Sequence, residues 1–238
     1  MLTIVIPTKD EEAYLPRLLS SIKHQTVQPF EIIVADAQST DRTREIARSF
    51  GAKVVEGGPV AIARNRGAAH ATTDLMLFLD ADVELLDPEF LEKSVKEMFE
   101  RKFDLATCDV VPLSHARIDH FLHRAYNAYV HVCGSLFPHA PGFCMIVRKD
   151  LHDKLGGFDE SVVFCEDHDY ARRFRSVGRF GFLRSTQIPV SIRRLDRDGR
   201  WTIAVKYLLA EVHLAILGPV RHNYFHYTFG HKRPLQKS

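Results

Sequence analysis

Short apolar stretches alternate with helical segments over the first 110 residues, and this alternation constrains the fold more than any other feature of the sequence. Such an order is typical of a mainly parallel α/β sheet with helices on both faces, in the manner of a Rossmann-like fold. In these sheets the ligand binds at the carboxyl ends of the strands. The expected strands are 2–6, 31–35, 53–55, 75–79 and 104–110, and the expected helices are 11–24, 41–50, 59–70 and 88–101.

The alternation weakens after residue 110. We expect a basic loop over 194–200 ahead of the last helix, and an irregular His- and aromatic-rich end over 218–238. The chain is therefore expected to continue its α/β domain into a helical and basic C-terminal part. The expected helices are 115–132, 151–155, 166–177 and 201–217, and the expected strands are 143–147 and 188–193.

Charged residues are distributed unevenly along the chain. Residues 1–171 carry a net charge of −9 and residues 172–238 carry +11, although the whole chain has only +2. The small total predicts no nucleic-acid partner. The acidic part favours metal and nucleotide chemistry, whereas the basic part suits an anionic substrate, a membrane surface or simply a solvated face.

Composition and segment lengths narrow the class of protein. Of the 238 residues, 45% are hydrophobic and 26% are charged, which is typical of a globular protein and excludes a disordered chain. No apolar run reaches the ~20 residues that span a bilayer, and Met1 leads directly into a strand, so we expect no signal peptide. The four Cys lie far apart and are expected to be reduced. We therefore expect a cytoplasmic protein that can contact the inner face of the membrane peripherally.

Two carboxylates follow the most apolar expected strand. Asp80-Ala81-Asp82 comes directly after residues 75–79. Carboxylates two residues apart at a strand end suit a hard divalent cation that is shared with substrate phosphates. A buried strand does not normally end in paired acids without a partner, because like charges repel each other. A short Asp-x-Asp sequence also arises by chance, but this position favours a Mg²⁺ or Mn²⁺ site.

Asp36 and Arg64 are two further candidates for ligand contact. Asp36 ends the second expected strand. Ser39, Thr40 or Asp41 can cap the helix that follows, which leaves the Asp36 carboxylate for a base or a ribose. Arg64 lies on the helix before the apolar strand, and its guanidinium suits a diphosphate or a base. The alternative for Arg64 is a solvated basic face.

Acidic residues also gather at the start of the expected helix 166–177. Glu166 and Asp167 either complement the helix dipole there or provide a general base beside a pocket. His222 and His226 have helical ligand spacing, but we interpret them as part of an aromatic and His-rich tail rather than as a zinc site.

Arginines cluster ahead of the last expected helix, where we expect a loop that closes over a diphosphate with Arg194 in contact. The helix carries an apolar stripe, which either packs on the sheet as core or rests on an anionic membrane together with the basic tail. The arginines are Arg193, Arg194, Arg197 and Arg200, and the stripe is Trp201, Val205, Leu208, Val212 and Ala215.

These motifs, in this order, resemble those of the family-2 glycosyltransferases, which have the GT-A fold. The resemblance covers about residues 2–180. It differs at Ala37 and Gln38, where the family pattern has Asp and Gly, and it lacks the Gln-x-x-Arg-Trp of the processive enzymes, which favours transfer of one sugar. The matching segments are 4–12, 36–41, 63–67, 80–82, 157–160 and 166–167.

The resemblance implies an inverting transfer of one hexose from a nucleoside diphosphate sugar to an acceptor hydroxyl. It implies that Asp82 and Asp80 hold a divalent cation, Mg²⁺ or Mn²⁺, and that Asp167 deprotonates the acceptor with Glu166 as its neighbour. The implied donor contacts are Pro7, Thr8, Glu11, Asp36, Arg64, Asp80 and Ala81, to which the basic loop adds Arg194.

The resemblance also suggests partners and a division of the chain. The donor is a UDP- or GDP-sugar, and the acceptor is a saccharide or a lipid-linked molecule such as a lipid phosphate. Residues 1–110 would bind the nucleotide sugar, 111–200 would form the acceptor side, and 201–238 would form the last helix and the basic tail. Two other functions stay open, namely an inactive GT-A module that binds nucleotide sugars and a nucleotidyltransferase. The latter would normally carry a Gly-rich basic loop after the first strand.

Overall fold

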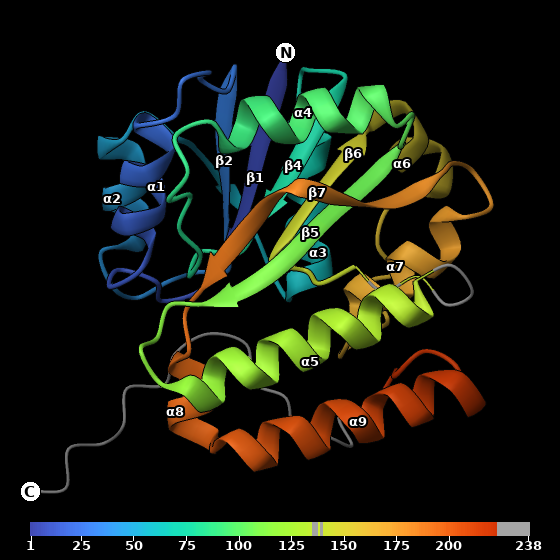
Figure 1. Cartoon of the computed structure of the whole chain (residues 1–238). Coiled ribbons are helices and arrows are strands. Elements are labelled where there is room, and N and C mark those ends of the chain that lie inside the picture. Colours follow the sequence, from blue (N-terminus) through green and yellow to red (C-terminus); the bar gives the residue numbers. More distant parts are fainter. Residues whose placement is uncertain (135–137, 139, 223–238) are drawn as a thin grey trace, which may run out of the picture.

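A mixed seven-stranded sheet in the order β3-β2-β1-β4-β6-β5-β7 forms the centre of the molecule (Figure 1). The computed structural model describes residues 1–134, 138 and 140–222. Strand β6 runs antiparallel to its neighbours β4 and β5, and the other pairs are parallel, which confirms the mainly parallel α/β sheet. The strands are β1 (Leu2–Thr8), β2 (Glu31–Asp36), β3 (Lys53–Glu56), β4 (Leu75–Leu79), β5 (Leu105–Pro112), β6 (Cys144–Arg148) and β7 (Phe180–Val190).

Helices cover both faces of the sheet, as expected. Alternate residues of a strand point to opposite faces, so Ile4 joins one buried cluster with α1 and α4, while Val5 joins the other with α3 and α7. Helix α2 lies on the face of α1, and helix α6 lies on the face of α3. These helices are α1 (Leu15–Lys23), α2 (Thr43–Ser49), α3 (Val60–Ala69), α4 (Phe90–Glu100), α6 (Lys149–Leu155) and α7 (Glu166–Phe174).

Three further helices lie beyond the carboxyl ends of the parallel strands (Figure 1). They are α5 (Arg117–Cys133), α8 (Arg193–Asp198) and α9 (Arg200–Ile216). The prediction of a basic loop over 194–200 is therefore wrong. Helix α8 occupies most of these residues, and only Gly199 separates it from α9. Gly199 has a φ of 85°, a left-handed value that glycine adopts without strain.

Two other expectations need correction at their boundaries. Helix α1 begins at Leu15 rather than at residue 11, because Pro16 has no backbone N–H to donate and is therefore suited to the first turn of a helix. Of the strand expected at 188–193, only residues 188–190 belong to a strand, as the end of the longer β7 that pairs with β5 along the edge of the sheet, and Arg193 already begins α8. No helix in the part of the chain that the structure describes is long and apolar enough to cross a membrane. The tail that contains His226 lies outside the described residues, and the division at residues 110 and 200 remains a prediction.

Candidate active site

Acidic side chains gather at the carboxyl ends of β1, β2 and β4. Glu11 follows β1, Asp36 ends β2, and Asp80 and Asp82 follow β4. Glu11 lies close enough to Asp80 and Asp82 for both charges to raise its pKa. The ends of β1 and β4 thus bring Glu11, Asp80 and Asp82 together at one edge of the sheet.

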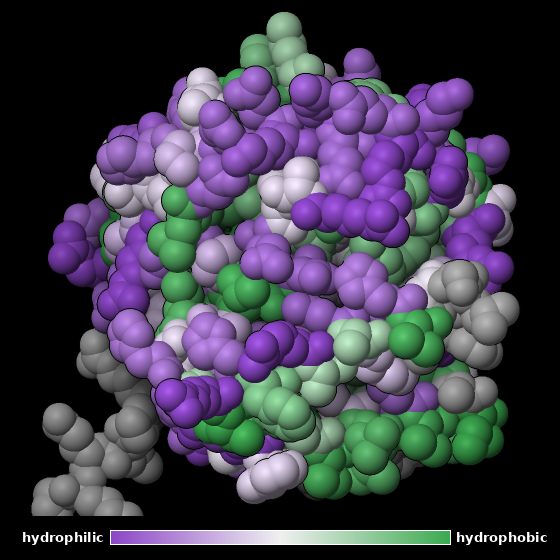
Figure 2. All heavy atoms as spheres, in the orientation of Figure 1, coloured by the Kyte–Doolittle hydropathy of each residue, from purple (hydrophilic) through white to green (hydrophobic). Residues whose placement is uncertain are grey.

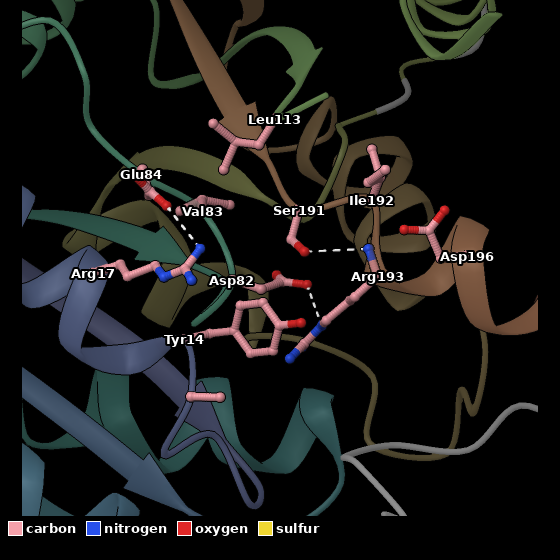
Figure 3. Close-up of a pocket in the computed structure, with 11 residues that line it drawn as sticks. Tyr14, Arg17, Asp82, Val83, Glu84, Leu113, Ser191, Ile192, Arg193 and Asp196 are labelled. Atoms are coloured by element: carbon pink, nitrogen blue, oxygen red, sulfur yellow. Dashed lines mark hydrogen bonds and ion pairs between the residues drawn. The ribbon is translucent and has the colours of Figure 1, made fainter. Parts of the chain in front are cut away.

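One arginine bridges two of these acids. The Arg193 guanidinium donates to both Glu11 oxygens, at 2.6 and 2.8 Å, and its Nε lies 2.7 Å from Asp82 Oδ2. Its Cζ atom is 4.4 Å from the centre of the Tyr14 ring, and Figure 3 shows Tyr14 and Asp82 beside the Arg193 side chain. The sequence predicts Arg193 as a member of the arginine cluster, but Arg194 as the residue in contact with the diphosphate. The start of α8 at Arg193 decides which arginine reaches the acids.

A cavity of about 250 Å³ adjoins this bridge (Figure 3). Tyr14, Asp82 and Arg193 line it, together with Leu113, which follows β5, and Asp196 of α8. Burial raises the pKa of Glu11 to about 7, although Arg193 acts in the opposite direction. The cavity therefore has an acidic wall whose charge is already partly neutralised by a residue of the chain itself.

A second arginine, Arg64, bridges another pair of acids. Its Nη2 lies 2.9 Å from Asp80 Oδ1, and its Nη1 lies 2.8 Å from Glu166 Oε1. Helix α3 places it this deeply because Gly67 allows the helix to approach β1, where a Cβ would lie 2.3 Å from Val5 Cγ1. With 1% of its surface exposed, Arg64 is not part of a solvated face, so that alternative is wrong.

The pKa values of the bridged acids reflect their burial. Burial raises the pKa of Asp80, against the opposing charges of Arg64 and Arg194. Burial and the neighbouring Asp167 charge raise the pKa of Glu166, against Arg64. Arg194 thus acts on Asp80 through its charge, while its Nη1 lies 3.4 Å from the Tyr207 hydroxyl.

Asp36 organises the turn that follows β2. Its Oδ1 accepts a hydrogen bond from Thr8 Oγ1 at 3.1 Å, and its Oδ2 accepts one from the Ser39 amide at 2.9 Å. Arg44 Nε lies 3.5 Å from Oδ2. Ser39 donates to Asp36 instead of capping α2, whose N-cap is Arg42. The Asp36 carboxylate is therefore buried and engaged within the protein rather than spare, as we expected it to be.

Asp167 and Glu166 begin α7 and differ in their partners. Asp167 Oδ2 accepts a hydrogen bond from the Gly142 amide at 2.6 Å, and its Oδ1 accepts one from the His168 amide at 2.9 Å. The Gly142 carbonyl accepts from Arg64 at 3.0 Å, and a Cβ at Gly142 would lie 2.7 Å from both Arg64 Nη2 and Asp167 Oδ2. Position 142 therefore requires glycine, and nothing in the sequence pointed to Gly142 as part of the site.

Two residues that the sequence analysis missed connect α7 to α9. His168 Nδ1 lies 2.7 Å from Glu211 Oε1. Burial alone would lower the pKa of His168, but the carboxylates of Asp167 and Glu211 outweigh it and raise that pKa. The start of α7 is thus held on the inner side of α9 by a charged contact.

The carboxylate oxygens at the carboxyl end of β4 are suited to a hard cation that is shared with a bound ligand. Asp80 and Asp82 provide carboxylate oxygens, which Mg²⁺ and Mn²⁺ prefer, and Mg²⁺ is commonly held by one or two carboxylates plus substrate phosphates. Among the described side chains, no group of three or more His, Cys, Asp or Glu forms a complete metal site. The protein thus offers a partial site, which phosphate oxygens would have to complete.

Comparison with known proteins identifies the family. The sequence model of "Glycosyl transferase family 2" matches residues 3–156, and the chain therefore belongs to this family. A 4,4'-diaponeurosporenoate glycosyltransferase from Staphylococcus haemolyticus (strain JCSC1435) is 36% identical over 111 residues, covering 43% of this chain and 29% of that protein. Validoxylamine A glucosyltransferase from Streptomyces hygroscopicus subsp. limoneus is 38% identical over 102 residues, covering 39% and 22%. The chain thus spans less than a third of the length of these curated relatives.

Solved structures confirm the GT-A fold. The mannosyltransferase PcManGT from Pyrobaculum calidifontis, in complex with GDP-Man and Mn²⁺, superposes with a TM-score of 0.71 at 20% identity, over 94% of this chain and 66% of that one. S. aureus TarS 1–349 in complex with UDP-GlcNAc gives a TM-score of 0.64 at 18% identity, over 89% and 66%.

Proposed function

We propose that this protein transfers one hexose from a UDP- or GDP-sugar to an acceptor hydroxyl, with inversion and with a divalent cation. The observation that carries the proposal is the acidic cluster of Glu11, Asp80 and Asp82 at the carboxyl end of the sheet, where this fold binds its ligands. The GDP-Man and Mn²⁺ of PcManGT and the UDP-GlcNAc of TarS, both of the same fold, support this class of donor.

The donor side of the site would hold the nucleoside diphosphate. Asp82 and Asp80 would hold Mg²⁺ or Mn²⁺, and the cation would supply positive charge for the diphosphate that leaves. Arg193 and Arg194 would turn to the phosphate oxygens, for which a guanidinium fork is suited. The remaining proposed donor contacts are Pro7, Thr8, Glu11, Asp36, Arg64 and Ala81.

Asp167 would act as the general base. The acceptor oxygen would form a bond to the anomeric carbon while the bond from that carbon to the diphosphate breaks, and the acceptor proton would pass to an Asp167 oxygen. Glu166 is less suited to this role because it is ion-paired with Arg64, whereas the hydrogen bonds to Asp167 come from backbone amides. Attack from the side opposite the leaving group inverts the configuration.

The acceptor would be a saccharide or a lipid-linked molecule that is used at the cytoplasmic side of a membrane. The charge of +11 over residues 172–238 supports an anionic acceptor or surface. The names of the two curated relatives point to different acceptors, diaponeurosporenoate in one and validoxylamine A in the other. The acceptor class therefore has to come from this chain's own C-terminal part.

One observation favours a second candidate, an inactive module that binds nucleotide sugars. Arg64 and Arg193 already pair with Asp80 and Asp82, so the chain supplies its own cations at the proposed metal site. An inactive module would bind the donor without Mn²⁺ and would not turn it over.

A donor screen distinguishes the two functions. Purified protein is incubated with UDP- and GDP-sugars, with Mn²⁺ or with a chelator, and released nucleoside diphosphate is measured. A transferase releases diphosphate slowly by transfer to water, and only with the cation. If the protein binds the donors but releases no nucleoside diphosphate, either with Mn²⁺ or with the chelator, it is the inactive module.

A further inference from the structure

The outer side of α9 is apolar and exposed. Trp201, Leu208 and Ile216 recur at intervals of seven and eight residues, which places them on one face of the helix. All three are exposed, and Trp201 is 71% exposed. Apart from Thr202, every side chain described as exposed on α9 is apolar. Packing of this stripe on the sheet, one of the two interpretations of the sequence, is therefore wrong.

Helix α5 extends this surface. It lies beside α9 and runs in the same direction, because Asp119 near its start pairs with Arg200 at 2.6 Å and Tyr129 near its end lies 3.4 Å from Glu211 (Figure 1). Phe121 and Val132 of α5 are exposed. Figure 2 shows hydrophobic residues gathered over the part of the molecule where α5 and α9 lie.

We propose that this surface, the α5–α9 face, docks onto an anionic phospholipid membrane. Phe121 and Val132 of α5 and Trp201, Leu208, Val212 and Ile216 of α9 form its apolar centre. The proposal deepens the proposed function, because it names the surface at which the acceptor is met, and it rests on that function only for this last step. Helices that lie in the plane of a bilayer surface bury an apolar face and have basic residues beside it.

The charges on the two helices fit an anionic partner. Their acids, Asp119 and Glu211, point inward and pair with Arg200 and with His168. The charged side chains described as exposed on α5 are Arg117 and Arg124, both basic. A phospholipid surface with anionic headgroups is complementary to both the apolar centre and these two exposed arginines.

The size of the face argues against a second copy of the chain as its partner. Two helices of 17 residues are about 25 Å long, and side by side they are about 20 Å wide, which gives a face of about 500 Å². Stable protein interfaces bury about 800 Å² on each partner. The face is too small for a stable dimer, whereas a bilayer sets no minimum area.

The inner side of α9 contacts the active site at two points. Glu211 holds His168, next to the proposed base Asp167. Arg200, adjacent to Trp201, lies 3.1 Å from Asp196, which lines the cavity beside Asp82. A membrane in contact with the outer side of α9 would therefore lie one helix away from both the base and the proposed cation site. This arrangement suits an acceptor that is anchored in the same bilayer.

Flotation with vesicles tests the docking surface. The full chain is mixed with vesicles of phosphatidylcholine alone, or with 30% phosphatidylglycerol as an anionic lipid (on the order of the anionic content of a biological surface). Trp201 is the only Trp of the chain, so its fluorescence reports directly on the face. We expect flotation with the anionic vesicles and a shift of Trp emission to shorter wavelength, both weakened by high salt.

Matched substitutions locate the contact. Leu208→Asp and Leu86→Asp change residues that are 64% and 62% exposed, and Phe121→Asp and Phe99→Asp change residues that are 60% and 61% exposed. Only Leu208 and Phe121 lie on the α5–α9 face. We expect their variants to lose about 10-fold or more in vesicle affinity, and the Leu86 and Phe99 variants to float like the unchanged protein.

Several results would overturn the proposal. One is a protein that stays unbound at low salt, and another is equal binding by all four variants, which would place the contact in residues 223–238 or elsewhere. A dimer in sedimentation experiments that Leu208→Asp dissociates, without vesicle binding, would assign the face to a second copy. Donor turnover in solution is measured in parallel, because a protein that turns over donor but does not float contradicts the docking surface alone. A protein that floats without turnover contradicts the proposed function alone.

Discussion

The donor side and the acceptor side of the site are built differently. On the proposed donor side, Arg64 of α3 and the acids at the ends of β1, β2 and β4 are largely buried and paired with partners in the protein, and the family match over residues 3–156 covers this part of the chain. On the acceptor side, α7, α8 and α9 lie beyond that match, and α9 exposes an apolar surface. The family match thus covers the proposed donor side, whereas α7, α8 and α9, which would meet the acceptor, lie outside it.

The two bridging arginines show the same contrast. Arg64 comes from α3, is fully buried and connects both sides through Asp80 and Glu166. Arg193 comes from the six-residue helix α8, and its side chain is 13% exposed at the cavity, against 2% for that of Arg64. We infer that Arg64 is a fixed part of the framework and that Arg193 is the arginine that ligands displace.

The largest effect is expected on the acceptor side. Asp167→Asn removes the proposed base with little change of shape, and loss of a general base lowers the rate by ~10²–10⁴-fold. Donor affinity should stay the same, because the donor contacts are unchanged. Steady-state rates and donor titration check both statements. If Glu166→Gln is the slower variant and Asp167→Asn turns over normally, the base is assigned to the wrong carboxylate.

Removal of the framework arginine should be the next largest effect. Arg64→Met leaves Asp80 and Glu166 buried without their cation, and breaking a buried ion pair in this way costs about 3–5 kcal/mol of unfolding free energy. Arg193→Met should cost about 2 kcal/mol or less, because burial already raises the pKa of Glu11 to about 7, so that Glu11 can take up a proton and only Asp82 stays charged. Urea unfolding of both variants measures the difference. Equal losses would contradict the distinction between the two arginines.

His152, where α6 contacts α7, should make the stability of the protein depend on pH. Burial lowers the pKa of His152 to about 4, and its Nδ1 lies 2.9 Å from the Tyr170 hydroxyl. An unfolded His titrates near ~6.5, so the unfolded chain binds a proton first as the pH falls from that value towards 4. The unfolding free energy should therefore fall by about 2–3 kcal/mol, on account of His152, as the pH is lowered from 7 to 4.5.

Comparison with His152→Gln isolates this contribution. The variant should be less stable at pH 7, because packing changes, but its unfolding free energy should fall less between the two pH values. Urea unfolding of both proteins at each pH gives the two differences. An identical fall in both proteins would show that His152 is not held neutral.

The smallest effect concerns the exchangeable arginine. Arg193→Gln frees the Asp82 carboxylate, so Mn²⁺ should bind without nucleotide about 10-fold more tightly, the equivalent of one charged hydrogen bond. Arg197→Gln is the control, since this neighbour on α8 pairs with Asp198. Titration followed by the electron paramagnetic resonance of free Mn²⁺ measures both. Weaker Mn²⁺ binding by the Arg193 variant would mean that this arginine supports the cation site.

Much of the sheet could be predicted from the sequence because its central strands are apolar throughout. Strand β4 occupies the predicted residues 75–79, all of them buried. Most of β7 was missed because it is an edge strand in which buried and exposed residues mix, with Arg184 and Gln187 exposed. Helix α8 was missed because six residues, five of them charged, show no apolar periodicity.

The candidate site could be predicted only in part, for a related reason. The acids at 36, 80 and 82 were found because they follow strands whose ends meet at one edge. The partners of the two arginines could not be predicted, because the residues of each pair lie far apart in the sequence. The hydrogen bond from Arg64 to Glu166 spans 102 residues, and that from Arg193 to Glu11 spans 182. No local pattern encodes such pairs, which exist only once the helices are packed.

The central claim is that Asp82 makes donor binding depend on a divalent cation. Calorimetric titration of UDP and GDP, with and without Mn²⁺, tests it in the unchanged protein, in Asp82→Asn and in Asp74→Asn, whose residue lies at the opposite end of β4. We predict that Mn²⁺ strengthens binding of one of the nucleotides by about 10-fold or more, that Asp82→Asn abolishes this gain, and that Asp74→Asn retains it. Nucleotide binding that is the same with and without Mn²⁺, or a gain that survives in Asp82→Asn, would contradict the account.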